Sequence, residues 1–176
     1  MADGMPRRVA MISVHTSPLA VPGSGDAGGM NVYLAQVSRQ LAAMGVHVDI
    51  FTRRGAPEIP DRQVLADGVQ VHNIGGQNLI SASKDDLVEL LPDFTDGVLQ
   101  RVDQMAQPRY DAVHAHYWLS GPVAQELAAQ WDVPVVASMH TLGAVKNLAH
   151  QQPLEPPVRL RVEERLAHEA DLLIVN

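Results

Sequence analysis

The chain has no cysteine, few basic residues and no long apolar run, and each of these absences excludes a class of protein. Without cysteine neither a disulfide nor a thiolate metal site can form, which suits a reducing cytoplasm. Lysine and arginine number 13 against 20 aspartates and glutamates, giving a net charge of −7, and the basic residues are scattered. Nucleic acids and anionic membrane surfaces both call for clustered basic residues, so neither is an expected partner.

The amino-terminal segment MADGMPRR is too polar for a secretory signal, and no apolar run approaches the roughly 18 residues of a membrane span. We therefore expect a cytoplasmic protein. Its 176 residues, 46% of them hydrophobic, are enough to bury a substantial core as one domain. The chain ends directly after a strand-like run, so we also expect it to be part of something longer.

Short β-branched runs alternate with helical patterns along the chain, and this alternation is typical of an α/β fold. Right-handed crossovers would make it a doubly wound, parallel, Rossmann-like sheet, with ligands beyond the carboxyl ends of the strands. The predicted strands are Val9–Val14, Val46–Phe51, Val69–Ile74, Ala112–His116, Val135–Met139 and Leu172–Val175.

The helices are predicted from apolar residues that recur every three or four positions. Tyr33, Leu34, Val37, Leu41 and Met44 form one such stripe, and Gly45 follows as a carboxyl-terminal cap. The other predicted helices are a stripe from Phe94 to Met105 after the breaker Pro92, a helix over Ser120–Trp131, and a helix over Val158–Ala170. The Pro-rich stretch Gln151–Pro157 reads as a surface loop.

A glycine-rich loop, HTSPLAVPGSGDAGGMN over residues 15–31, joins the first predicted strand to the first helix. Backbone without side chains can approach a ligand closely, and the N–H groups at a helix start favour negative charge. The loop therefore predicts a phosphate or sugar site, although a Gly/Pro loop without a ligand is also open. Gly23 to Gly28 spell the dinucleotide fingerprint G-x-G-x-x-G, but eight residues separate the strand from its first glycine, so a nicotinamide site is disfavoured.

Polar residues follow the predicted strands. His114 and His116 share one strand face and His140 ends the next strand, so they could bind zinc, but no acidic residue completes a ligand set and hydrogen bonds to hydroxyl groups are commoner. Asp111 and Asp132 precede strands at the opposite edge and read as turn residues.

Four residues that could bind a phosphate lie near the predicted carboxyl edge: Lys84, Tyr117, Thr141 and Arg159. Each also has an ordinary explanation. Lys84 could be a solvated helix start, and Arg159 and Arg161 with Glu163 and Glu164 could form a salt-bridged helix face. Trp118 and Trp131 read as packing residues.

Five segments carry a family resemblance: RVAMISVHTSPLAVPGSGDAGGMNVY, VHVDIFTRR, VHAHYWLSG, MHTLGAVKN and RLRVEERLAHEAD. Together they resemble the N-terminal half of a retaining glycosyltransferase with two Rossmann-like domains, the GT-B class. Within that class they are most similar to the inositol-phosphate N-acetylglucosaminyltransferases of mycothiol biosynthesis, while relatives similar to sucrose-phosphate synthase carry similar blocks.

The resemblance implies a role for particular residues. Lys84, Tyr117, Thr141 and Arg159 would grip the phosphate of the acceptor, with Arg161 an alternative to Arg159. His15 and the loop Asp26, Ala27, Gly28, Gly29, Met30 and Asn31 would hold the inositol ring. Val21, Pro22 and Gly29 would meet the donor, and His140, given as catalytic, would lie beside the transferred sugar.

The resemblance also implies partners. Residues 1–176 would be a single Rossmann-like acceptor-binding domain that binds no cofactor itself, takes a phosphorylated acceptor, and works with a UDP-sugar held by a C-terminal domain absent from this chain. The expected enzyme is a UDP-sugar-dependent hexosyltransferase, transferring GlcNAc to an inositol phosphate with retention; this part alone is expected to be inactive. Four alternatives stay open. The whole enzyme could use magnesium, the protein could form a homodimer, the acceptor could be that of another GT-B transferase, and the chain could be a non-catalytic binding module.

Overall fold

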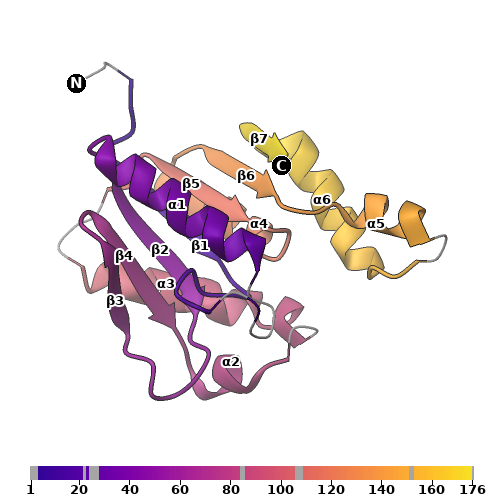
Figure 1. The fold of residues 1–176 in the computed structure, drawn as a ribbon, viewed down its shortest axis with the longest axis horizontal. Coiled ribbons are helices and arrows are strands. Elements are labelled where there is room, and N and C mark those ends of the chain that lie inside the picture. Colours follow the sequence, from indigo (N-terminus) through magenta and orange to yellow (C-terminus); the bar gives the residue numbers. More distant parts are fainter. Residues whose placement is uncertain are drawn as a thin grey trace.

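In a computed structural model, seven strands form one sheet in the order β3-β4-β2-β1-β5-β6-β7 (Figure 1). The structure describes residues 4–21, 23, 28–83, 86–105, 109–150 and 153–175. The strands are β1 (Arg8–Ser13), β2 (His47–Arg53), β3 (Arg62–Ala66), β4 (Val69–Ile74), β5 (Ala112–His116), β6 (Val135–Met139) and β7 (Leu172–Val175). The six predicted strands are confirmed, four of them with the same bounds.

One strand was not expected from the sequence. β3 pairs antiparallel with β4 at the edge of the sheet, whereas every other pair is parallel. The expectation of a wholly parallel sheet is therefore wrong at this edge. The segment RQVLA is short and half polar, and a β-hairpin through Gly68, at φ 74°, reverses the chain.

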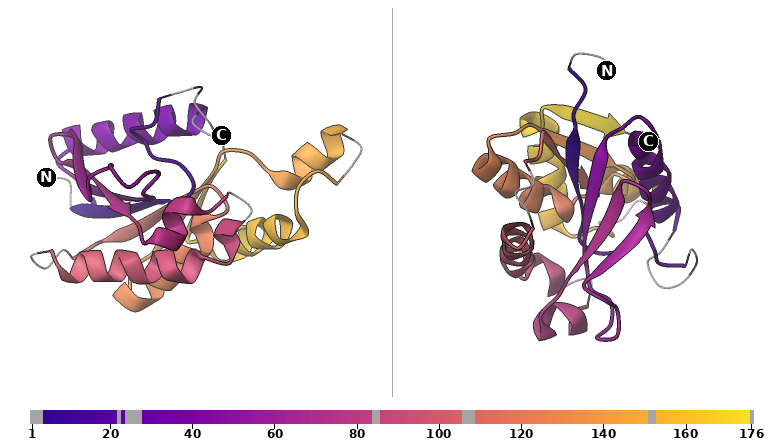
Figure 2. Two further views of the ribbon diagram at one scale, coloured as in Figure 1. Left: turned by 90° about the horizontal axis from the view of Figure 1, so that it is seen from below. Right: turned by 90° about the vertical axis from the view of Figure 1, so that its left-hand side faces the viewer.

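Helices cover both faces of the sheet. α1 (Gly29–Ala43) covers one face, and α3 (Leu91–Asp103), α4 (Ser120–Trp131) and α6 (Pro157–Glu169) lie on the other, as the left view of Figure 2 shows. The doubly wound prediction is thereby confirmed. Two short helices, α2 (Gln77–Ser81) and α5 (Gly143–His150), and a 3-10 turn, η1 (Asp86–Val88), were not predicted.

Local sequence sets the helix ends. Gly45, at φ 89°, follows α1 as the left-handed residue that the sequence predicts. Pro92 lies inside the first turn of α3 instead of before it, where a missing N–H is tolerated. α4 ends at Trp131, and Asp132, which caps it, is left-handed at φ 54°, so the turn role of Asp132 is confirmed.

Among the described residues, the core has three apolar clusters: a large one on each side of the central strands, and a small one of Ala137, Met139 and Leu166 between β6 and α6. Val9, Met11 and Ile50 pack beneath α1, while Ile12, Phe51 and Phe94 belong to the larger cluster on the opposite face. Trp118, 5% exposed, is part of that larger cluster and Trp131 packs against it, so both are packing residues as expected. None of the helices in the described part of the chain has the length and apolar character needed to span a membrane.

A buried ionic network, which we call the Asp49 cluster, interrupts the larger apolar cluster. The Asp49 carboxylate accepts hydrogen bonds from Arg8 Nε at 2.7 Å and from the Tyr110 hydroxyl at 3.1 Å, and it pairs with His72 Nε2 at 2.9 Å. Burial alone would raise the pKa of Asp49, but the hydrogen bonds from His72 and Arg8 hold it below its usual value.

Candidate functional site

Residues from distant parts of the sequence meet at the carboxyl ends of β5 and β6. Tyr117 directly follows β5, Thr141 lies two positions after β6, and Arg159 lies in the first turn of α6. Because β5 and β6 are parallel neighbours, the first two are carried to the same edge. Three of the four predicted phosphate ligands therefore come together, and the fourth, Lys84, lies outside the described residues.

Arg159 is the centre of this site, and its side chain is 0% exposed. Its Nη1 donates to the Tyr117 hydroxyl at 3.1 Å, and its Nη2 donates to the carbonyl and hydroxyl oxygens of Thr141 at 2.7 and 2.9 Å. Burial alone would lower the pKa of Arg159, but its hydrogen bond to Glu163 and the charges around it raise the pKa overall. The guanidinium is thus a permanent, rigidly held cation.

Two carboxylates complete what we call the Arg159 cluster. Glu163 accepts the Arg159 Nε hydrogen bond at 2.6 Å and also the backbone N–H of Gly143 at 2.8 Å. Glu155 bridges Arg159 Nη1 at 2.8 Å and Lys146 Nζ at 3.0 Å. Burial alone would raise the pKa of Glu155, but the hydrogen bonds from Lys146 and Arg159 lower it.

The sequence predicted part of this network. The expectation of an ordinary salt-bridged helix face is right for the pairing of Arg159 with Glu163, but wrong for its exposure, since both side chains are buried. Arg161 and Glu164 are exposed on the same helix, so Arg159 is the arginine that faces the site. The roles of Glu155 and Lys146 were missed, and the only signal for Glu155 was its spacing of four residues before Arg159.

Tyr117 connects this cluster to the loop after β1. The Arg159 guanidinium carbon lies 4.9 Å from the centre of the Tyr117 ring, and the His15 ring lies 4.5 Å from that centre. Tyr117 has a φ of 73°, a left-handed conformation that few non-glycine residues adopt and that is concentrated at functional sites. Its backbone N–H donates to the carbonyl of Ser138 on β6 at 3.1 Å, which anchors the turn.

Asn31, predicted to contact the acceptor, stabilises the loop at the start of α1. Its side chain is 2% exposed; Nδ2 donates to Thr16 Oγ1 at 2.7 Å and to the Ser17 carbonyl at 2.5 Å. Oδ1 accepts the backbone N–H of Gly28 at 3.0 Å, the backward half of a capping box. Asn31 therefore ties the segment after β1 to the helix start, a role for which Thr16 and Ser17 gave no sequence signal.

The glycines at this helix start have open surroundings. A Cβ atom built on Gly28 or Gly29 meets no atom of the described residues within 4 Å, so packing against this part of the chain does not require glycine at either position. Met30 is half-buried against the core, and Val21 is 71% exposed. The other predicted loop ligands, Pro22, Asp26 and Ala27, lie outside the described residues.

Three histidines lie beneath α1 beside this edge. His114 Nε2 pairs with the Ser138 hydroxyl at 2.8 Å, which confirms the hydrogen-bond interpretation, and His116 Nδ1 pairs with His140 Nε2 at 3.2 Å. Burial, with His140 nearby, lowers the pKa of His114 to about 4, and burial also lowers the pKa values of His116 and His140. All three are therefore uncharged at neutral pH.

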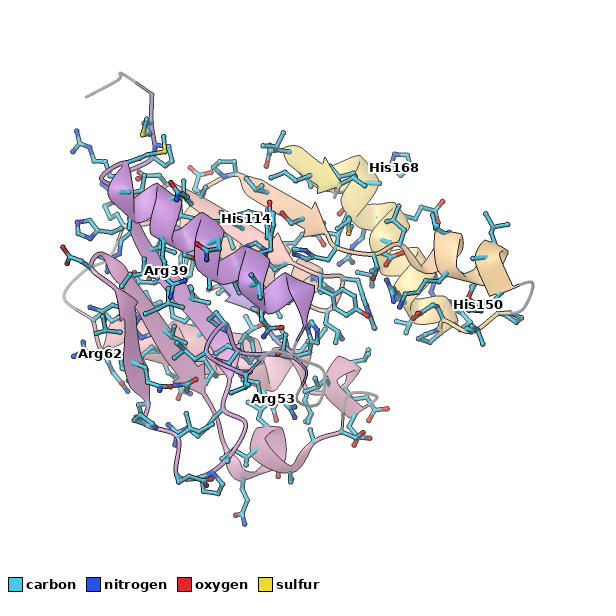
Figure 3. All side chains as sticks on the ribbon, in the orientation of Figure 1. Arg39, Arg53, Arg62, His114, His150 and His168 are labelled. Atoms are coloured by element: carbon cyan, nitrogen blue, oxygen red, sulfur yellow. The ribbon has the colours of Figure 1, made fainter. Side chains whose placement is uncertain are left out.

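The zinc alternative receives no support from this arrangement. Within the ranges that the structure describes, no group of three or more histidine, aspartate or glutamate side chains is placed to hold a metal ion. Figure 3 shows His150 and His168 on α5 and α6, away from His114 on the sheet. Asp111, expected to be a turn residue, lies in the bend directly before β5. Its carboxylate accepts the backbone N–H groups of Arg7 and Arg8 at 2.6 and 2.9 Å, which joins this bend to the start of β1.

The fold and this edge define a Rossmann-like half of the kind found in GT-B glycosyltransferases. The sucrose-phosphate synthase of Thermosynechococcus elongatus superposes with a TM-score of 0.86 at 34% identity, over 97% of this chain and 42% of that one. The calicheamicin glycosyltransferase CalG4 shares the fold, with a TM-score of 0.51 at 18% identity, over 96% of this chain and 47% of that one.

Sequence comparison then identifies the family. Residues 28–176 match the model of the glycosyl transferase 4-like domain, and the chain belongs to this family. It is 48% identical over 172 residues to the D-inositol 3-phosphate glycosyltransferase of Kineococcus radiotolerans, covering 97% of this chain and 40% of that protein. The same-named protein of Mycolicibacterium smegmatis is 49% identical over 177 residues, covering 97% of this chain and 40% of that protein.

These matches confirm the resemblance to the GT-B glycosyltransferases and, within them, to the inositol-phosphate enzymes. This family is not one of the nicotinamide-dependent oxidoreductases, whose G-x-G-x-x-G fingerprint the glycine-rich loop also matches. The chain spans about two fifths of the length of the curated relatives that it matches.

Proposed function

We propose that this chain binds the acceptor in a retaining glycosyltransferase that moves GlcNAc from UDP-GlcNAc to 1D-myo-inositol 3-phosphate. The observation that carries the proposal is the Arg159 cluster: a fully buried guanidinium with Tyr117 and Thr141 hydroxyls beside it, at the ligand-binding edge of a glycosyltransferase domain. Relatives about 48% identical bear the name D-inositol 3-phosphate glycosyltransferase, which supports this acceptor.

The phosphate would lie against Arg159, Tyr117 and Thr141, with Lys84 a further proposed ligand. A phosphate monoester carries nearly two negative charges at neutral pH, and each charge-assisted hydrogen bond to it contributes roughly 1.5–3 kcal/mol. The inositol ring would lie toward His15 and the start of α1, which the Tyr117 ring joins to the Arg159 cluster. No atom of the described residues lies within 4 Å of a Cβ built on Gly28 or Gly29, which is suited to a closely approaching sugar or diphosphate.

In the proposed reaction the bond between the anomeric carbon and the UDP oxygen breaks, leaving an oxocarbenium-like centre. The acceptor hydroxyl attacks from the same face, and its proton passes to the departing phosphate oxygen. No protein nucleophile is needed, so the residues of this chain act by positioning and electrostatics. His140, uncharged because burial lowers its pKa, would offer the transferred sugar a hydrogen bond instead of a positive charge.

Activity of the chain joined to its UDP-sugar-binding half tests this proposal. UDP release with UDP-GlcNAc should require 1D-myo-inositol 3-phosphate, and unphosphorylated myo-inositol should be a poor acceptor. The likeness to sucrose-phosphate synthase makes fructose 6-phosphate the informative competitor. Turnover with fructose 6-phosphate and none with the inositol phosphate would assign a different acceptor to the same site.

A further inference from the structure

Every donor of the Arg159 guanidinium already has an acceptor within the protein. The two Nη2 hydrogens point to the carbonyl and hydroxyl of Thr141, and Nε points to Glu163. Nη1 serves the Tyr117 hydroxyl and Glu155. Since a guanidinium has five N–H groups, a phosphate can bind Arg159 only by replacing one of these acceptors.

The surroundings of the acceptors indicate which one can leave. Thr141 contributes a backbone carbonyl, and Glu163 is 7% exposed on the helix of Arg159 itself, where it also holds the N–H of Gly143. Glu155 is 17% exposed and lies in the short segment before α6. Its other oxygen binds Lys146, which is 43% exposed, so the carboxylate can turn from Arg159 and keep an ionic partner at the surface.

We propose that Glu155 is a built-in competitor for the acceptor phosphate: its carboxylate takes the anion position on Arg159 and must move aside before a phosphate group can bind. The inference rests on the proposed function for the identity of the acceptor, but the competition itself concerns any anion. Glu155 thereby prevents weakly bound inorganic anions from occupying the site, while an acceptor that also makes contacts through its ring can displace it.

This competition has a thermodynamic signature. If binding requires a state in which Glu155 has left Arg159, the apparent Kd of every anion is raised by the same factor, the inverse of the population of that state. Removing the carboxylate should tighten inorganic phosphate and 1D-myo-inositol 3-phosphate equally. Unphosphorylated myo-inositol does not need Arg159, so its affinity should not change.

Isothermal titration of Glu155→Gln, Glu155→Ala and the unmodified chain with these three compounds tests the inference. Both variants should bind the two phosphates about tenfold more tightly, by a common factor, with myo-inositol unchanged. Glu164→Gln, which removes the same charge from an exposed position of α6, is the matched control and should match the unmodified chain. Thermal unfolding shows which variants are folded. Two different replacements of Glu155 are used so that the test can still be made if one of them does not fold.

The outcomes separate the two proposals. Weaker or unchanged phosphate binding in folded Glu155 variants would mean that Glu155 only supports the loop, and would overturn the inference. Tighter binding of inorganic phosphate without any preference for the inositol phosphate would keep the competitor and overturn the proposed acceptor. A failure of both phosphates to bind any form would overturn both, since no anion site would exist at Arg159.

Discussion

The Asp49 and Arg159 clusters are both buried ionic networks, but they are built in opposite ways. At Asp49 an anion on a central strand is surrounded by donors, of which Arg8 and His72 are also held on strands. At Arg159 a cation in the first turn of a helix is surrounded by acceptors, one of which, Glu155, comes from a partly exposed loop. The Asp49 cluster holds strands together and therefore stabilises the fold. In the Arg159 cluster one partner, Glu155, can be exchanged, so this cluster can bind a ligand.

Removal of the central charge of the Asp49 cluster should have the largest effect. Asp49→Asn leaves the buried His72 and the partly exposed Arg8, whose side chain is 30% exposed, without their anion. Breaking a fully buried ion pair costs about 3–5 kcal/mol, so the exposure of Arg8 places the expected cost at the lower end, about 3 kcal/mol. We expect a loss of that size in the free energy of unfolding, measured with urea. Asp103→Asn, on an exposed position, should stay within about 0.5 kcal/mol. Equal stability of the two variants would contradict a structural role for Asp49.

Changes in the Arg159 cluster should act on the acceptor more than on the donor. When the chain is joined to its UDP-sugar-binding half, Arg159→Lys and Lys84→Ala should each reduce kcat/KM for the phosphorylated acceptor. The expected loss of transition-state stabilisation is about 1.5–3 kcal/mol, because a charge-assisted hydrogen bond is lost. The KM for the UDP-sugar should hardly change. Arg161→Lys, on the exposed face of the same helix, is the control. An equal loss for donor and acceptor would refute the assigned roles.

Two glycines are expected to have different roles: Gly121 allows two helices to pack closely, and Gly29 is proposed to allow a ligand to approach the start of α1. A Cβ on Gly121 of α4 would come within 2.3 Å of Leu166 Cδ1 on α6, so Gly121→Ala should lower the free energy of unfolding by about 1–3 kcal/mol. The methyl group of Gly29→Ala meets no atom of the described residues within 4 Å, so this variant should be equally or slightly more stable. It should nevertheless reduce sugar transfer when the chain is joined to its UDP-sugar-binding half. If Gly29→Ala were as active as the unmodified enzyme, no ligand would approach this helix start closely.

The histidines beside the site should add a pH dependence that spreads over more than two pH units. His114 has an ordinary pKa near 6.5 in the unfolded chain and about 4 in the fold, so between these values the unfolded state binds more protons. The contribution of His114 to the free energy of unfolding is therefore fully present above about pH 6.5 and is lost toward pH 4, by about 1 kcal/mol per pH unit. Asp49, with its lowered pKa, loses its contribution only at lower pH. Urea unfolding from pH 7 to 4 should show a smaller slope for His114→Gln.

The positions of the strands followed from the sequence wherever apolar β-branched runs were bounded by turn residues, whereas their order in the sheet comes from the structure. β5, β6 and β7 were predicted with their observed bounds, and parallel pairing placed Tyr117 and Thr141 at one edge. β3 was missed because an edge strand needs only one apolar face and its sequence shows little alternation.

The polar partners of the site could not be predicted in the same way. The burial of Arg159 depends on how α6 packs against α4 and β6, which no local pattern encodes. Glu155 and Lys146 meet because the segment before α6 approaches helix α5 in space. Asp49 lies between the apolar residues Val48 and Ile50 of β2, and a search for hydrophobic periodicity does not show which partners a buried carboxylate there would have.

Tyr117 combines two opposed demands in one residue. Its left-handed backbone, at φ 73°, is a geometry that glycine or asparagine would adopt more easily, at a saving of about 1–3 kcal/mol. Its ring and hydroxyl, in contact with His15 and Arg159, can be supplied only by an aromatic side chain. Tyr117 is also only 9% exposed within the larger apolar cluster, so a glycine here would relieve the backbone strain but remove that packing together with the contact to Arg159. The strained turn is thus maintained by the same side chain that faces the ligand edge.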